Sequence, residues 1–199
     1  HEVSKKIISA KNPIVIFGQS ALKLNSSGYL FEGMKKFLSE NNKINDDWNA
    51  LNVLSNNAST VGAYDLDILD NETIDNVLSN QFELVFLFGQ DNLNIKKKNE
   101  FIVYIGTHGD RGAEMADLIL PSAAYTEQDG YYTNLEGNLQ LAFKASYPPG
   151  EAKEDWEIVN ELSKKLKGKS LYTNKQELID NLLNYLNQKT KKNGETVKN

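Results

Sequence analysis

The chain has 199 residues, of which 40% are hydrophobic and 25% are charged, so it is long enough to bury roughly 70% of its unfolded surface in one core. Its net charge of −5 argues against a large phosphate-contacting surface, and we expect no nucleic-acid partner. The absence of cysteine excludes disulfides, cysteine nucleophiles, thiolate zinc sites and cysteine-held iron–sulfur clusters. Since His1 and His108 are the only histidines, a histidine metal cluster is excluded as well.

No apolar run approaches the roughly 20 residues that a membrane-spanning helix needs, and the mean hydropathy is −0.51. We therefore expect no direct membrane insertion. The N-terminal segment HEVSKKIISAKNPIVIF lacks the long apolar core and small-residue cleavage site of a secretory signal. Because the chain begins with His rather than Met, we expect a mature or trimmed N-terminus.

The first half of the chain predicts one buried strand and two helices. The run PIVIF at residues 13–17 is short, β-branched and apolar, which is typical of a strand buried on both faces. An amphipathic helix is expected next, and a short helix at residues 71–79. The apolar segment at residues 48–54 remains ambiguous between helix and strand because its period is mixed. The stripe of the first helix consists of Leu30, Met34, Phe37 and Leu38.

Three further apolar runs follow: ELVFLFG at 83–89, FIVYIG at 101–106 and DLILP at 117–121. Four such runs separated by helical or loop segments indicate an α/β fold with a mostly parallel sheet. Residues 122–149 show no period and are predicted to form a long loop, which is usually functional or interfacial. Two amphipathic helices are expected after it, one ended by Gly168 and one around Leu178, Leu182 and Leu186. We predict a single α/β domain over residues 1–187 and a flexible tail over 188–199.

Two turns at strand ends are candidates for ligand chemistry. Residues 18–21, Gly-Gln-Ser-Ala, could present backbone N–H groups to an anion, but they match neither glycine-rich nucleotide-binding pattern, so a plain turn is favoured. His108 follows the third apolar run, at the end of a sheet where ligands usually bind, and Asp110 is close enough in sequence to assist proton chemistry. A local packing role for His108 is favoured because no nucleophile or metal partner is evident.

The 122–149 segment carries three carboxylates, Glu127, Asp129 and Glu136. They are enough for an acid/base pair, but spacing alone does not show whether two of them meet across a substrate. Solvated surface acids are the favoured interpretation. We assign no catalytic, cofactor-binding or metal residue in this chain.

The block ILPSAAYTEQDGYYTNLEG at residues 119–137, within a longer match over 116–166, closely resembles the C-terminal region of the large, or G, iron–sulfur subunit of respiratory complex I, NADH:quinone oxidoreductase. PIVIFGQSAL, DWNALNVLSNNASTVGAYDLDI and LVFLFGQDN occur upstream in the order seen in that family. The resemblance implies a molybdopterin-oxidoreductase-like, doubly wound α/β domain without cofactor. Position 138, usually basic in the family, is Asn138 here.

The resemblance also implies that the redox groups lie elsewhere. The family's cluster-binding cysteines are not in this chain, so iron–sulfur clusters and FMN are expected on partner chains. The expected partners are the N-terminal iron–sulfur part of the large subunit and other peripheral-arm subunits of complex I. The family's N-terminal part is not in this chain, so we expect either a split-gene product or a fragment. Arg111 is the single arginine among 22 basic residues, a bias typical of A+T-rich genes, and organellar genes of this kind fit the split-gene possibility.

The sequence leads to one main hypothesis and two alternatives. The main one is a structural, non-catalytic complex I module at the matrix side of the mitochondrial inner membrane, or at the cytoplasmic face of a bacterial membrane. Tyr125, Tyr131 and Tyr132 are its candidate contacts. One alternative is a pterin-pocket module of a molybdopterin oxidoreductase such as a formate dehydrogenase. The other is a free-standing α/β protein that binds a small molecule at its strand ends.

Overall fold

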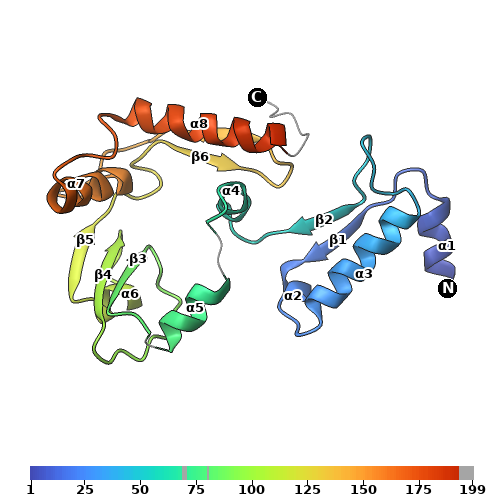
Figure 1. The fold of residues 1–199 in the computed structure, drawn as a ribbon, viewed down its shortest axis with the longest axis horizontal. Helices are drawn as coiled ribbons and strands as arrows, with labels where there is room; N and C mark the ends of the chain where they lie inside the picture. Colours follow the sequence, from blue (N-terminus) through green and yellow to red (C-terminus); the bar gives the residue numbers. More distant parts are fainter. Residues whose placement is uncertain (69–70, 80, 193–199) are drawn as a thin grey trace. The chain divides into compact units, whose positions relative to one another are not determined.

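A computed structural model of the chain describes residues 1–68, 71–79 and 81–192. Contacts divide the chain into two compact units (Figure 1). The first holds residues 1–62 and 133–137, and the second holds residues 63–132 and the described residues from 138 onward. The prediction of one domain over residues 1–187 stays a prediction.

The first unit is a pair of parallel strands with a helix packed on them. Val15 pairs with Leu51 and Gly18 with Leu54, so the segment at 48–54 ends in a strand. The Phe17 and Phe31 rings meet edge to face at 5.6 Å, which packs the long helix on the first strand. The elements are α1 (Glu2–Ser9), β1 (Val15–Gly18), α2 (Gln19–Leu22), α3 (Ser27–Glu40) and β2 (Leu51–Leu54), and α4 (Thr60–Asp65) follows.

The second unit is built on a three-stranded parallel sheet in the order β3-β4-β5. A separate two-stranded sheet, β6-β7, lies within the 122–149 segment, and two long helices follow. The elements are α5 (Asn71–Leu78), β3 (Leu84–Phe88), β4 (Phe101–Gly106), α6 (Arg111–Met115), β5 (Leu118–Pro121), β6 (Gly130–Thr133), β7 (Leu139–Ala142), α7 (Asp155–Lys167) and α8 (Lys175–Lys192).

Helices cover both faces of the three-stranded sheet. Successive side chains of a strand point to opposite faces, so each strand contributes residues to both packing layers. On one face, side chains including Ile102 and Tyr104 pack against residues of α5 and α6. On the other face, Val103 and Ile105 pack against Ile158 of α7. The predicted α/β class with parallel strands and helices on both faces is confirmed.

Two sequence-based expectations differ from the structure. The 122–149 segment is not an irregular loop throughout, since it contains the β6-β7 sheet. The last helix does not end at residue 187 but continues to Lys192, into the predicted tail. Its final turns are held because Lys189 Nζ donates to the carbonyls of Tyr64 and Asp65 at 2.9 Å each. Residues 193–199 lie outside the described part of the chain.

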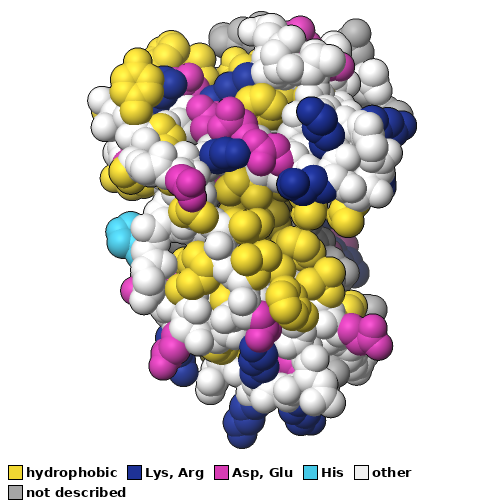
Figure 2. All heavy atoms as spheres, turned by 90° about the vertical axis from the view of Figure 1, so that its left-hand side faces the viewer, with side chains coloured by type: hydrophobic (Ala, Val, Ile, Leu, Met, Phe, Trp, Pro, Cys, Tyr) yellow, Lys and Arg dark blue, Asp and Glu magenta, His cyan; other side chains and the backbone are white. Residues whose placement is uncertain are grey.

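The face of the sheet that α7 covers remains half exposed along β3. Side chains there carry large apolar groups, and Figure 2 shows a hydrophobic area in the middle of the face it draws, bordered by charged side chains. Exposed apolar area of this kind is typical of surfaces that contact other proteins. The exposed members of this sheet face are Leu84, Phe86, Phe88 and Phe101. Within the residues described, no helix is both long and apolar enough to span a bilayer.

Candidate functional site

The carboxyl end of β4 is closed by a buried tyrosine rather than opened for a ligand. Tyr104 is 1% exposed, and its hydroxyl donates to Asp91 Oδ2 at 3.1 Å. Asp91 Oδ1 accepts from the Gly112 N–H at 2.9 Å, so one carboxylate joins β4 to the start of α6. Burial and the neighbouring Asp91 raise the pKa of Tyr104 to about 12. The hydroxyl is therefore a fixed hydrogen-bond donor at neutral pH.

Two glycines make room for the Tyr104 ring. A Cβ at Gly106 would lie 2.3 Å from the hydroxyl oxygen, and one at Gly112 would lie 2.5 Å from the ring. The glycines around His108 thus serve packing as well as turn formation. Sequence reasoning missed Tyr104 and Asp91, because the tyrosine looks like one more member of an apolar strand.

His108 is exposed, and its Nδ1 lies 2.7 Å from the hydroxyl of the adjacent Thr107. Asp110 is the N-cap residue of α6 and makes no side-chain capping bond. The structure therefore places His108 in a local contact with its neighbour. A purely local role for His108, favoured by the sequence over proton chemistry, stays a prediction.

The turn at residues 18–21 serves the first unit internally. Gly18 caps the short helix α2, and Gln19 Oε1 accepts from the N–H of Asn56 at 3.0 Å. Gln19 thereby ties the end of β1 to the segment after β2. The plain-turn interpretation accounts for these contacts.

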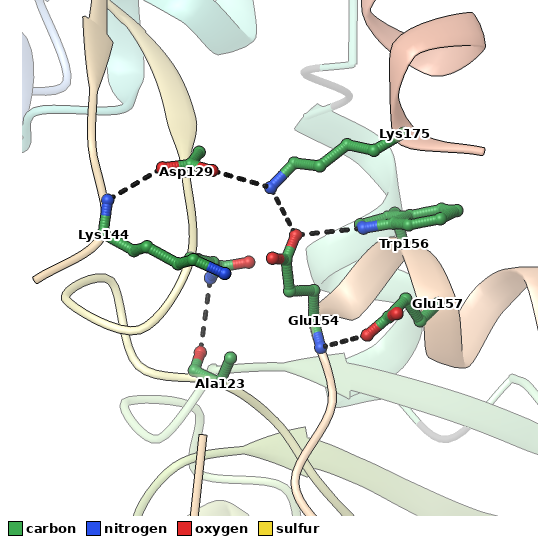
Figure 3. A network of polar contacts seen from close by, with 8 residues as sticks. Ala123, Asp129, Lys144, Glu154, Trp156, Glu157 and Lys175 are labelled. Carbon is green, nitrogen blue, oxygen red and sulfur yellow. Dashed lines mark hydrogen bonds and ion pairs between the residues drawn. The ribbon is translucent and has the colours of Figure 1, made fainter. Parts of the chain in front are cut away.

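A network of polar contacts holds the start of the 122–149 segment against α7 and α8 (Figure 3). Glu154 Oε2 accepts from Lys175 Nζ and from the Trp156 indole N–H, the latter at 3.0 Å. Lys175 also lies 3.9 Å from Asp129, whose other oxygen accepts from the Lys144 N–H at 2.8 Å. Because Glu154 and Lys175 are mostly buried, these charge-assisted bonds are shielded from salt.

Two of the three predicted acids are structural rather than solvated. Asp129 belongs to the network, and Glu127 Oε2 accepts from the Ala124 N–H at 2.9 Å, which closes the turn at its own start. Glu136 is exposed. Each bonded carboxylate thus fixes backbone, an arrangement that differs from an acid/base pair facing a substrate. The expectation of solvated acids is wrong for Glu127 and Asp129.

Three aromatic side chains of the segment stay open to solvent: Tyr125 is 76% exposed, Phe143 78% and Tyr147 76%. The backbone carbonyl of Thr126 accepts from the N–H groups of residues 145 and 146, so the two stretches of chain that bear these rings run beside each other. Lys144 Nζ stands 4.7 Å from the Tyr147 ring centroid. Of the predicted contact residues, Tyr125 is fully displayed, whereas Tyr131 and Tyr132 are half buried.

A parallel sheet flanked by helices, with a buried tyrosine at the end of β4 and exposed aromatic side chains in the following segment, defines an α/β module. The sequence matches the family described as Molybdopterin oxidoreductase over residues 1–165, and the chain belongs to this family.

Similar proteins show which members of this family the chain resembles. The G subunit of NADH-quinone oxidoreductase from Rickettsia bellii is 44% identical over 179 residues, 89% of this chain. The NADH-ubiquinone oxidoreductase 75 kDa subunit of Reclinomonas americana is 38% identical over 86% of the chain, and the mitochondrial 78 kDa subunit of Neurospora crassa is 37% identical over 92%. These matches confirm the resemblance to the large subunit of complex I, which the last two names call the 75 kDa or 78 kDa subunit. The chain spans about a quarter of these relatives, 26%, 26% and 25% of their lengths.

The family name raises the question whether these strand ends suit a pterin cofactor, which carries an anionic phosphate. At the end of β4 the charged groups near Tyr104 are the carboxylates of Asp91 and Asp110. Arg111, the nearby cation, donates to Asn94 Oδ1 at 3.3 Å. An acidic donor set disfavours a phosphate, and the ring of Tyr104 fills the space beside the glycines. The residues at this strand end therefore do not fit the group. Among the described residues no cluster of three metal-ligating side chains occurs.

Proposed function

We propose that this chain is a structural module of respiratory complex I. It supports the cluster-bearing part of the large iron–sulfur subunit during electron transfer from NADH to quinone. In this role it carries no electrons and has no active site, and its iron–sulfur and FMN partners are other chains. It is located at the matrix side of the mitochondrial inner membrane and associates with the membrane through those partners.

One observation carries the proposal: large apolar side chains stay exposed on a chain whose relatives are complex I subunits. Tyr125, Phe143 and Tyr147 lie together on a segment held in place by the Glu154 network. Aromatic side chains on a fixed backbone favour binding because little conformational entropy is lost on contact. A module of this kind fixes the geometry of its neighbours by burying shared surface.

The test is native isolation through a tag on this chain, followed by mass spectrometry and metal analysis of the same sample. We expect cysteine-rich iron–sulfur subunits and quinone-reducing membrane subunits, with no molybdenum or tungsten. Stoichiometric molybdenum or tungsten would support the pterin-pocket alternative instead. Isolation of the chain alone would support a free-standing binding protein.

A triple variant and a single control variant test the contact role. Replacing Tyr125, Phe143 and Tyr147 together by Ala removes three exposed rings, so the fold is expected to persist while partner recovery falls about tenfold or more. Tyr29→Ala removes an equally exposed ring from α3 and serves as the control. Full assembly and full NADH oxidation in cells lacking the chain would overturn the proposal.

A further inference from the structure

The end of α7 carries a concentrated positive charge in an acidic chain. Lys164, Lys165, Lys167 and Lys169 lie close together in sequence, and all four are exposed. None of them lies within ion-pair distance of a carboxylate in the described part of the chain. We name these four lysines, together with Leu166 and Leu171, the basic turn. The net charge of the whole chain is −5, so the basic turn is opposite in sign to the chain as a whole, and Glu161 is a carboxylate near enough to interact electrostatically with Lys164 and Lys165.

The basic turn is also apolar. Leu166 is 74% exposed and lies between Lys165 and Lys167, and Leu171 is 51% exposed and lies two residues after Lys169. A helix C-terminus favours cations through its dipole, which accounts for lysines in the last turn of α7. The dipole gives no reason for exposed leucines among them. The combination of charge and apolar area is typical of a protein contact.

Hydrogen bonds hold the basic turn in a fixed conformation. Gly168 adopts a left-handed φ of 71°, and its N–H donates to the Lys164 carbonyl at 3.0 Å. The buried Ser163 hydroxyl donates to the Lys169 carbonyl at 3.0 Å. Asn160 accepts from the N–H groups of residues 171 and 172 and donates to the carbonyl of residue 172. The backbone is therefore ordered before any partner binds, which lowers the entropy cost of binding.

We propose that the basic turn binds an acidic segment of a partner protein, one in which carboxylates flank an apolar side chain. Charge complementarity selects the partner's sign, and the two leucines select its apolar group. A protein fits better than an anionic membrane. The first half of α7 carries acidic side chains, and its Ile158 is buried against the sheet. Only the last turn of α7 is exposed at every position, whereas a membrane-surface helix lies in the plane of the membrane and contacts it along its whole length. This inference names one contact of the module and so rests on the proposed function.

Zero-length cross-linking of the native assembly tests the contact directly, since a carbodiimide joins a lysine amine to a carboxylate it touches. We expect cross-links from the basic turn to Asp or Glu of a partner chain. We also expect the four amines to react at least tenfold more slowly with an acylating reagent in the assembly than in the free chain. Equal amine reactivity in assembly and free chain would overturn the inference while leaving the proposed function intact.

Charge reversal gives the second arm. Changing the four lysines of the basic turn together to Glu is expected to reduce recovery of the cross-linked partner at least tenfold. The control makes the same change in total charge at four exposed lysines of the first unit, Lys5, Lys11, Lys23 and Lys35. Equal loss in both variants, or amine protection by phosphatidylserine vesicles alone, would contradict a specific protein contact. Recovery of the chain without complex I partners would instead defeat the proposed function.

Discussion

Tyr104 and Asp91 are joined by a hydrogen bond of 3.1 Å between a fully buried tyrosine and a carboxylate in the loop after β3. The same carboxylate accepts from Gly112 at the start of α6. Asp91 thus links the loop after β3 to β4 and to the start of α6, at the carboxyl edge of the sheet. In many open α/β proteins this edge binds a ligand, whereas here a side chain of the sheet itself occupies it.

Tyr104→Phe removes the hydroxyl and keeps the ring. We expect a loss of about 1 kcal/mol in the free energy of unfolding, because Asp91 loses a buried donor. The pKa of Tyr104, about 12, is raised above the ordinary 10.0, so its contribution to stability is complete below pH 10 and is lost as pH rises toward 12. Urea unfolding at pH 8 and pH 11 checks both expectations. Tyr125→Phe, at an exposed position, is the control and should change neither value.

Gly112→Ala places a methyl group 2.5 Å from the Tyr104 ring, a distance at which atoms must move. We expect a destabilisation of about 1–3 kcal/mol from overpacking. Gly109→Ala is a matched control in the same turn, since nothing lies within 4 Å of its Cβ position. Thermal unfolding of the two variants compares them directly, and equal midpoints would show that the ring is free to move.

Asp117→Asn tests the ion pair at the start of β5. Lys97, at 2.6 Å, together with the Ile102 N–H, lowers the pKa of Asp117 below its ordinary 3.8. A lowered pKa contributes stability above the ordinary value and loses it as pH falls through the folded-state value. We therefore expect the variant to unfold at lower temperature than the parent at pH 7, with the difference shrinking below pH 4. Asp46→Asn, at an exposed position, should show no such trend.

Lys189→Met tests the attachment of α8 to the end of α4. The ammonium group donates to the carbonyls of residues 64 and 65 and pairs with Asp67 at 2.8 Å. Its hydrogen bond is the main cause that lowers the pKa of Asp67. In the variant we expect that pKa to rise toward 3.8 in an NMR titration, and the amides of the last turns of α8 to exchange faster. Gln188→Met, one position earlier and exposed, should leave both unchanged.

Glu154→Ala removes the central acceptor of the network in Figure 3. Lys175 and the Trp156 indole then lose their shared partner, so we expect a loss of about 1–3 kcal/mol in unfolding free energy. Limited proteolysis should cut the chain near Tyr125 more rapidly than in the parent. Glu151→Ala, at an exposed site three residues earlier, is the control. Unchanged proteolysis would mean that the segment is held by other contacts.

The sheet of the second unit was predictable because its strands are continuous apolar runs, which few other structures accommodate. The β6-β7 sheet was not, since β6, with the sequence GYYT, shows no apolar/polar alternation, and the alternation of β7, LQLA, covers only four residues. The last turns of α8 were missed for a similar reason, because they are fixed by Lys189 and not by an apolar stripe.

The polar contacts of the site were harder to predict than the strands. Asp91 precedes Tyr104 by 13 residues and Glu154 precedes Lys175 by 21, distances at which no local pattern operates. Glu127 and Asp129 looked like solvated acids because sequence does not reveal which backbone N–H groups a fold will bring to them. The plain turn at Gly18 and the local role of His108 stay predictions, with which the contacts of Gln19 and Thr107 agree.

The link from Asp129 through Lys175 to Glu154 also bears on the order in which the chain folds. Local helices form before contacts between distant residues, so we expect this link to form only after α8 has begun to form, later than the bonds of Asp129 and Thr126 to residues 144–146. During synthesis, at roughly 5–20 residues per second, Lys175 emerges seconds after Asp129. For that interval we expect the nascent chain to expose Tyr125 without the ion pairs that Lys175 later adds to the segment.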